Sequence, residues 1–342
     1  MARGRTNEKT IALALQGGGA HGAFTWGVLD RLLEDERLVI DAISGTSAGA
    51  MNAAVLADGF EKGGAMAARE ALARFWGAMG TAGGFSLWRS GPFDLFGPDW
   101  SPFALWFDWL GQMFSPYQLN PFNINPLRDV LRNTIDFNCV RRCRKIRLYV
   151  SATNLRTNRL RIFTAKELSV DVLLASACLP QIYPAVEIDG EYYWDGGYMG
   201  NPVLEPLIDE CPDIADILVV QINPTRRDDV PRTAQDIADR VNQISFNASL
   251  MREIGAIANI TRLIEAGVVK DPRYKCVYFH RVAAEDVMKG LSVRSKLDTN
   301  PRFLNQLREL GRARAGRWLE EHFADLGTRS TLDLSAWRPR TA

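Results

Sequence analysis

Two glycine-centred turns near the N-terminus constrain the fold more than any other feature of this chain. The first turn spans residues 17–22 (GGGAHG) and the second spans residues 45–49 (GTSAG). Each turn follows a short apolar run of strand character, at 10–16 and 39–44. Helical patterns follow the turns at 22–35 and 48–58. A strand–turn–helix unit that occurs twice in succession predicts an α/β domain with a mainly parallel sheet between helices.

The rest of the chain continues this alternation after an interruption at 83–126. Further helices are expected at 62–79, 126–135, 168–177, 233–266 and 301–323, and further strands at 146–153, 160–164, 185–194 and 216–222. In the long helix at 233–266, one stripe typical of an amphipathic helix holds Ile237, Val241, Ile244, Ala248 and Met251. The 342 residues are enough for one large α/β domain with a sizeable core.

The second turn has the G-x-S-x-G pattern that makes a serine a nucleophile. A serine on a tight strand-to-helix turn needs small neighbours two positions away on each side, here Gly45 and Gly49, because larger residues clash with adjacent strands. The turn exposes the Ser47 hydroxyl, and the start of the next helix stabilises developing negative charge. The alternative is a serine in a structural turn or at a helix N-cap. The strand before it and the small-residue helix after it favour the nucleophile.

The first turn has two interpretations. Its backbone N–H groups can form an oxyanion hole for acyl transfer. Gly17, Gly19 and Gly22 also match G-x-G-x-x-G, which would make the chain a nucleotide-binding oxidoreductase. That interpretation requires an acidic residue at the carboxyl end of the second strand, about twenty positions on. Asp41 lies at the start of that strand, so the fingerprint is incomplete and acyl transfer is favoured.

With a later Asp195-Gly196-Gly197, these motifs resemble those of the patatin-like phospholipases. These acyl hydrolases carry a glycine-rich oxyanion loop, a G-x-S-x-G elbow and a D-G-G or D-G-A motif, in this order. The stretch 175–180 (ASACLP) also resembles the family's block ahead of the aspartate. The resemblance covers residues 10–223 and implies a three-layer α/β/α sandwich with a central, mainly parallel sheet.

The same resemblance implies a division of the chain. Residues 8–223 would form the patatin-like catalytic domain, with 83–126 as an aromatic-rich cap or insertion. Residues 224–342 would form a helical C-terminal extension packed on the same domain.

The family's catalytic pair is a serine and an aspartate, which implies Ser47 as nucleophile and Asp195 as its base. An aspartate can accept the serine proton directly and later give it to the leaving alcohol. A partly dehydrated site would raise its pKa from about 3.9 toward a useful range. The implied function is hydrolysis of carboxylic esters of phospholipids or related fatty-acyl lipids through an acyl-enzyme, with no metal or organic cofactor.

The oxyanion donors are best assigned to backbone N–H groups of the glycine loop, at Gly18 and Gly19, helped by Ala48, which follows the nucleophile. Which of Gly17, Gly18 and Gly19 points inward stays open. His21 departs from the family pattern, because many members carry arginine or lysine at this position. We expect a structural role for His21 in the loop, with a charge that varies with pH.

Two alternatives to the dyad enzyme remain. A Ser-His-Asp triad would use His280 or His322, with Asp195 as the acid, in the chain order of α/β-hydrolases. His280 is more simply a strand-end residue, and His322 lies in a charged helical stretch. A non-catalytic lipid-binding protein would bind vesicles without hydrolysing them, but the intact set of serine, aspartate and glycines argues against it.

The segment 85–122 holds four of the nine tryptophans and several prolines. Its central run, 102–114, is apolar enough for a short helix. One interpretation is a cap that inserts at a lipid surface, and the other is a satellite core or an oligomer contact. The expected partners are therefore a fatty-acyl lipid and a peripheral membrane surface, while the oligomeric state stays open.

Composition narrows the remaining classes. A net charge of +1 argues against a general nucleic-acid binder. Five scattered cysteines fit a reducing compartment, and Cys139 and Cys143 lack the partners of a zinc site. No apolar run approaches the length of a membrane span, and the basic N-terminus lacks a signal-peptide pattern. We expect a cytoplasmic protein that can lie at a membrane surface.

Overall fold

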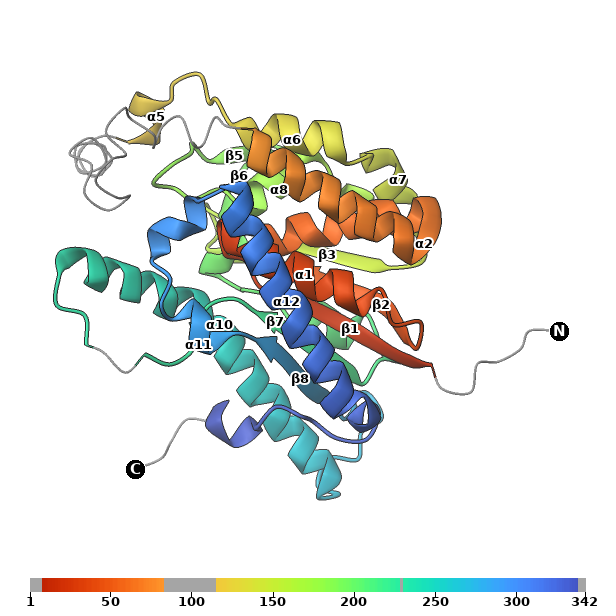
Figure 1. Ribbon diagram of the computed structural model, residues 1–342. Coiled ribbons are helices and arrows are strands. Elements are labelled where there is room, and N and C mark those ends of the chain that lie inside the picture. Colours follow the sequence, from red (N-terminus) through yellow and green to blue (C-terminus); the bar gives the residue numbers. More distant parts are fainter. Residues whose placement is uncertain (1–7, 83–114, 228–229, 338–342) are drawn as a thin grey trace.

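A computed structural model describes residues 8–82, 115–227 and 230–337 of the chain. Its centre is an eight-stranded sheet, whose strands are β1 Lys9–Leu15, β2 Leu38–Gly45, β3 Arg147–Asn154, β4 Arg159–Thr164, β5 Val186–Ile188, β6 Glu191–Asp195, β7 Asp216–Gln221 and β8 Tyr278–Ala283. The order is β5-β6-β3-β2-β1-β7-β8, with β4 paired to β3 (Figure 1). From β3 to β8 the pairings are parallel, whereas β4, β5 and β6 pair antiparallel. The expected mainly parallel sheet is confirmed.

Helices follow most strands and cover the sheet. They are α1 Gly22–Leu32, α2 Ala48–Thr81, α5 Pro116–Leu119, α6 Pro126–Thr134, α7 Phe137–Arg142, α8 Val170–Ser176, α9 Glu205–Asp209, α10 Ala234–Glu265, α11 Glu285–Met288 and α12 Pro301–His322. Short 3₁₀ helices are η1 Gly19–His21, η3 Ala165–Glu167, η4 Gly196–Tyr198, η5 Val293–Leu297, η6 Phe323–Asp325 and η7 Leu334–Trp337. Side-chain caps fix several starts, because Ser169, Thr233 and Asn300 each accept a hydrogen bond from an amide of the first turn.

Each strand and helix expected within the described residues is present, with two differences of detail. α2 contains both helices expected at 48–58 and 62–79, which meet at a kink where Gly63 and Gly64 leave the helical conformation. The region after residue 223 is not helical throughout, because it also contributes β8, which pairs with β7. His280 therefore lies inside a strand and not at its end.

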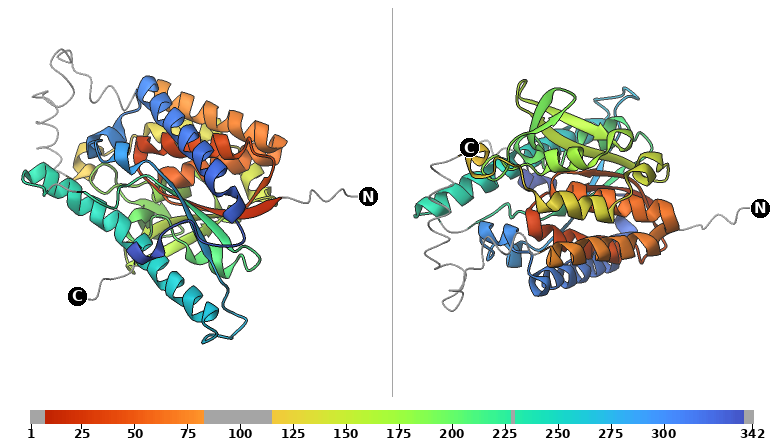
Figure 2. Two further views of the ribbon diagram at one scale, coloured as in Figure 1. Left: turned by 60° about the horizontal axis from the view of Figure 1, so that its bottom comes forward. Right: turned by 90° about the horizontal axis from the view of Figure 1, so that it is seen from above.

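The core has two parts, one on each face of the sheet. On one face, Ile11, Leu13 and Leu15 of β1 pack in a buried cluster with α1, α2 and α12. On the other face, Ala12 and Ala14 pack in a second cluster with α9 and α10. The right-hand view of Figure 2 shows α2 and α12 on one side of the sheet and α10 on the other. This is the three-layer α/β/α arrangement expected for the chain.

The apolar stripe predicted for the long helix α10 does not face the core over its first half. Ile237, Val241 and Ile244 are 47%, 59% and 54% exposed. The buried side chains lie further along and on another face, at Phe246, Leu250, Ile254 and Ala258. Figure 1 shows a reason, because the first half of α10 extends beyond the strands that the structure describes.

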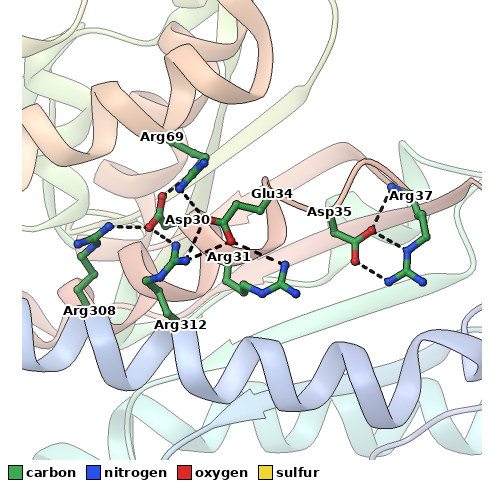
Figure 3. A network of polar contacts seen from close by, with 8 residues as sticks. All are labelled: Asp30, Arg31, Glu34, Asp35, Arg37, Arg69, Arg308 and Arg312. Atoms are coloured by element: carbon green, nitrogen blue, oxygen red, sulfur yellow. Dashed lines mark hydrogen bonds and ion pairs between the residues drawn. The ribbon is translucent and has the colours of Figure 1, made fainter.

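A buried carboxylate joins the three helices on one face of the sheet (Figure 3). Asp30 of α1 is 3% exposed and accepts hydrogen bonds from Arg69 of α2 (2.7 Å) and from Arg308 (2.8 Å) and Arg312 of α12. Glu34 also accepts from Arg69 and Arg312, at 2.6 and 2.9 Å. These arginines hold the pKa of Asp30 below its usual value, against the effect of burial. The C-terminal helix is thus tied to the first part of the chain.

Most of the aromatic-rich insertion expected at 83–126, namely residues 83–114, lies outside the described residues, and so does the expected helix at 102–114. The described end of that segment forms α5 and an exposed stretch in which Phe122 is 85% and Ile124 is 67% exposed. Over the described parts of the chain, no helix combines the length and apolar character needed to cross a membrane.

Candidate active site

The serine turn is built as a nucleophile elbow between β2 and α2. Ser47 has φ 54° and ψ −122°, in a region of backbone conformation that non-glycine residues seldom adopt. The flanking glycines leave room for this turn. A Cβ atom at Gly49 would lie 2.1 Å from the Leu15 carbonyl oxygen, and one at Gly45 would lie 2.7 Å from the Gly49 backbone. The surrounding strands therefore impose the strained turn that holds Ser47.

Three loops leave the sheet side by side at this point. Leu15 of β1 is in register with Gly45 of β2 and with Val220 of β7, so the glycine loop, the elbow and the segment after β7 start from one edge. The Ser47 amide donates to the hydroxyl of Ser176 at 2.9 Å. This edge collects the carboxyl ends of parallel strands, which is where α/β proteins place their sites.

Asp195 reaches the elbow from the last residue of β6. Its amide donates to the Cys178 carbonyl at 2.8 Å, and its own carbonyl accepts from the Thr153 hydroxyl at 2.8 Å, which fixes the backbone. The carboxylate accepts from the Gly197 amide at 2.7 Å, and the Ser47 hydroxyl lies close enough to it to lower the pKa of the carboxyl. Ser47 and Asp195, which lie 148 positions apart in the sequence (195 − 47), are thus brought together in the wall of one cavity.

Burial sets the protonation of Asp195. The residue is 1% exposed, and loss of solvent raises the pKa of its carboxyl to about 7. The hydrogen bond from Gly197, the nearby Ser47 hydroxyl and the positive charge of Lys296 act in the opposite direction and keep the pKa from rising further. A carboxylate with this pKa can accept a proton near neutral pH and return it.

The glycine loop lies directly against the elbow. A Cβ atom at Gly17 would lie 2.7 Å from the Ser47 Cβ atom. The Gly17 amide donates to Asn201 Oδ1 at 2.6 Å, so it is already used and we no longer count Gly17 among the expected oxyanion donors. The amides of Gly18, Gly19 and Ala48 are hydrogen-bonded to none of the described residues. Gly18, Gly19 and Ala48 line the same cavity as Ser47.

That cavity has a volume of about 430 Å³ and contains Ser47 and Asp195 at one wall. Most of its other walls are apolar, formed by Met51, Phe75, Trp76, Met79, Leu127 and Ile182. Phe246 of α10 and Lys296 of η5 complete it from the C-terminal third of the chain. The space suits an apolar chain with an ester group at the polar wall.

The three histidines are engaged elsewhere. His280 is fully buried between Asp216 (2.9 Å) and Thr331 (3.0 Å), and His322 contacts Asp325 at 3.1 Å. Neither is among the described residues that line the cavity, which removes the triad alternative. His21 is buried and bonded to the Ser295 hydroxyl at 2.7 Å. Burial lowers its pKa to about 3, so the expected charge change near neutral pH is wrong.

The dinucleotide alternative also loses support. Asp41 is paired with Arg147 in the neighbouring strand, and the carboxyl end of β2 carries the elbow in place of an acidic residue. No group of three or more histidine, cysteine, aspartate or glutamate side chains within the described ranges could hold a metal ion.

Several residues that support the site were not predicted from the sequence. Ser176 supports the Ser47 amide, while Asn201 and Asn223 hold the two polar groups of Gly17. Lys296 donates to Asn223. Ser176 lies within the ASACLP block, which was a usable signal. The others are ordinary polar residues whose role depends on distant packing.

Comparison with known proteins agrees with these motifs. A family model described as patatin-like phospholipase matches residues 13–208. Among solved structures, VipD from Legionella pneumophila is similar with 16% identity and a TM-score of 0.42, over 92% of this chain and 67% of that one. A structure of SpcU with ExoU from the type III secretion system of Pseudomonas aeruginosa is similar with 16% identity and a TM-score of 0.31, over 91% of this chain and 53% of that one. No curated protein matches the chain.

Proposed function

The chain belongs to the patatin-like phospholipase family, and on this premise we propose that it hydrolyses carboxylic esters of fatty-acyl lipids through Ser47 and Asp195. Family membership supports lipid hydrolase activity in general. The observation that carries the specific proposal is that the hydroxyl on a strained elbow shares one cavity wall with a buried carboxylate whose pKa is raised to about 7.

In the first step, the Asp195 carboxylate accepts the Ser47 proton while the oxygen attacks the ester carbonyl carbon. The carbonyl electron pair moves to the oxygen, and the amides of Gly18, Gly19 and Ala48 stabilise that charge. When the tetrahedral intermediate collapses, the bond to the alcohol breaks and Asp195 returns the proton to the leaving oxygen. The products are the alcohol and an acyl ester of Ser47.

In the second step, water hydrolyses the acyl-enzyme. Asp195, again ionised, takes a proton from water, and the hydroxide attacks the acyl carbonyl carbon in the same oxyanion hole. Collapse breaks the bond to Ser47, which regains a proton from Asp195. A fatty acid leaves and the enzyme is restored, so neither proposed reaction step requires a metal or an organic cofactor.

The substrate class follows from the cavity. Walls of Met51, Phe75, Trp76 and Met79 favour a long acyl chain over a short polar acyl group. We propose a phospholipid or a related fatty-acyl lipid, approached at a membrane surface. The exposed Phe122 and Ile124 support such an approach, because they precede Leu127, which lines the cavity.

We also propose that the chain forms one domain, with the catalytic groups in 8–223 and the region 224–342 packed on it. Two observations support this. β8 belongs to the same sheet as β1, and Phe246 and Lys296 line the cavity that contains Ser47.

The test combines labelling with product analysis. Wild type, Ser47→Ala, Asp195→Asn and the exposed-residue control Asp213→Asn are treated with a fluorophosphonate probe and, separately, with a long-chain phosphatidylcholine. We expect labelling of Ser47 and fatty-acid release by wild type and the control. Release should fall by at least about 1,000-fold in the two site variants. Equal release by Ser47→Ala and wild type would refute the proposal.

A further inference from the structure

A cationic side chain from the C-terminal third lies in the candidate acyl site. Lys296 of η5 lines the cavity with Ser47 and Asp195, although it lies far beyond the family match at 13–208. The side chain is partly buried, and loss of solvent lowers its pKa to about 8. At pH 7 the amine is therefore mostly protonated. His21, the basic residue of the glycine loop, is neutral because its pKa is about 3.

The ammonium group is connected to the glycine loop through one side chain. Lys296 Nζ donates to Asn223 Oδ1 at 2.7 Å. Asn223 is 2% exposed, and its Nδ2 donates to the Gly17 carbonyl at 3.0 Å. The backbone N–H of Asn223 donates to Gln16 Oε1 at 2.7 Å, which ties the same asparagine to the residue before the loop. The Asn223 side-chain amide, held between the Lys296 ammonium and the Gly17 carbonyl, restricts rotation of the loop backbone.

The backbone of η5 also presses on the loop. Gly19 has φ +59°, and a Cβ atom there would lie 2.3 Å from the Lys296 carbonyl oxygen. The neighbouring Ser295 accepts or donates a hydrogen bond with His21 at 2.7 Å. The loop thus meets η5 at Gly17 through Asn223, at Gly19 and at His21. These contacts surround the amides of Gly18 and Gly19, which are the donors of the proposed oxyanion hole.

We infer that Lys296 is a positioning residue of the acyl site, which holds the glycine loop through Asn223 and carries the positive charge that the loop itself lacks. The inference rests on the proposed function for its catalytic meaning. Its structural part, the fixing of the loop, stands on the contacts alone.

Charge gives the inference a pH signature. Asp195 is faced by the Ser47 hydroxyl, the Cys178 thiol, the Tyr198 phenol and Lys296, and burial raises the pKa of that thiol and that phenol, so they stay neutral. Lys296 is near Asp195, Asp239, Arg227 and His21. The ammonium lowers the pKa of Asp195, so its removal should shift the acid limb of activity to higher pH. Deprotonation of Lys296 near pH 8 should weaken the site at alkaline pH.

The test uses the full chain with Lys296→Met, Lys296→Arg and Lys289→Met, the last an exposed lysine outside the cavity. The first readout is hydrogen exchange of the peptide that contains residues 15–22, which needs no catalysis. The second is kcat and KM for a soluble neutral long-chain ester between pH 5 and 9.5, with hydrolysis in the presence of Ser47→Ala subtracted. Melting temperatures show whether each variant is folded.

We expect Lys296→Met to speed exchange in the loop peptide several-fold, and to lower kcat about 10- to 100-fold with KM changed less than about threefold. Its acid limb should move to higher pH. Lys296→Arg should keep most of kcat and lose the alkaline decline, and Lys289→Met should match wild type in every readout.

Unchanged exchange and unchanged kcat in Lys296→Met would overturn the inference while leaving the hydrolase intact. If the rate of the wild type did not decline at alkaline pH, the claim that the positive charge of Lys296 supports the site would be overturned. Absence of hydrolysis and labelling in the wild type would instead refute the proposed function. In that case the exchange readout still decides whether Lys296 holds the loop.

Discussion

Replacing Asp30 by asparagine tests how strongly the C-terminal helix is tied to the rest of the fold (Figure 3). The carboxylate accepts hydrogen bonds from Arg69, Arg308 and Arg312, which come from α2 and α12. An asparagine keeps one acceptor oxygen, but its amide group is a donor that faces guanidinium donors. The change therefore removes the charge and opposes at least one of the remaining contacts.

The expected loss of free energy of unfolding follows from how deeply Asp30 and its partner arginines are buried. Breaking a fully buried ion pair by removing one partner costs about 3–5 kcal/mol. Here the side chains of Arg69, Arg308 and Arg312 are 32%, 29% and 24% exposed, so water replaces part of what is lost. Arg69 and Arg312 also keep Glu34. We expect Asp30→Asn to lower the free energy of unfolding by about 2–3 kcal/mol.

Urea unfolding followed by tryptophan fluorescence measures this difference, with Glu309→Gln as the matched control. Glu309 also pairs with Arg308, at 3.2 Å, but is 64% exposed, so its loss should cost less than about 0.5 kcal/mol. The pKa of Asp30 is lowered in the folded state, so its stabilising effect is present above the unfolded value near 3.8 and disappears only as pH falls through the lower folded value. The difference in free energy of unfolding between Asp30→Asn and wild type should stay constant from pH 7 to pH 5. A loss no larger than that of Glu309→Gln would refute this account.

Three further predictions concern the site. Wild-type kcat/KM should rise about tenfold per pH unit below an apparent pKa of about 7, because Asp195 must be ionised to act as base, and an inflection near pH 4 would contradict this. Gly49→Ala should abolish soluble folded protein or activity, because the added Cβ would lie 2.1 Å from the Leu15 carbonyl oxygen. Gly77→Ala in the same helix is the control, because its Cβ meets no atom within 4 Å. It should raise the free energy of unfolding by about 0.5–1 kcal/mol, as measured by thermal unfolding. His21→Ala should reduce hydrolysis by a factor that is constant from pH 5 to 8, because the imidazole is neutral throughout, and a factor that varies over that range would contradict its low pKa.

Much of the fold was predictable because its signals are local. Strands β1, β2 and β7 are short apolar runs that end at turn residues. Parallel strands that are buried on both faces typically have such nearly continuous apolar sequences. The elbow was equally visible, since Gly45 and Gly49 are required by atoms within the turn and the strand beside it. The sequence pattern therefore predicts where Ser47 stands, and the D-G-G motif indicates Asp195.

The apolar face of α10 shows where a local pattern fails. Ile237, Val241 and Ile244 follow helical spacing, yet they are about half exposed because that part of the helix extends past the sheet. Periodicity tells which residues share a face, but not whether another element covers it. The first buried apolar side chain of the same helix is Phe246, which packs against Tyr198 of η4.

The support of the glycine loop was hidden for a different reason. Asn201, Asn223 and Lys296 are common polar residues with no spacing rule. The two asparagine side chains hydrogen-bond to Gly17, while Lys296 reaches the loop through Asn223 and through its carbonyl beside Gly19. The loop motif predicts that backbone amides will face a reacting oxygen, but it does not say which are free. The bond from Gly17 to Asn201 decides that question, and no local signal foretells it.

The proposed dyad has no histidine, so its base would need a pKa near the working pH, and burial alone would not keep the pKa of a carboxyl there. Complete removal of Asp195 from water would push its pKa up until the carboxylate no longer formed. The Gly197 amide, the Ser47 hydroxyl and the charge of Lys296 each favour the ionised form, and together they leave the value at about 7. Two of these groups come from the sequence motifs and the third comes from η5. The C-terminal region therefore contributes to the electrostatics of the site as well as to the packing of the fold.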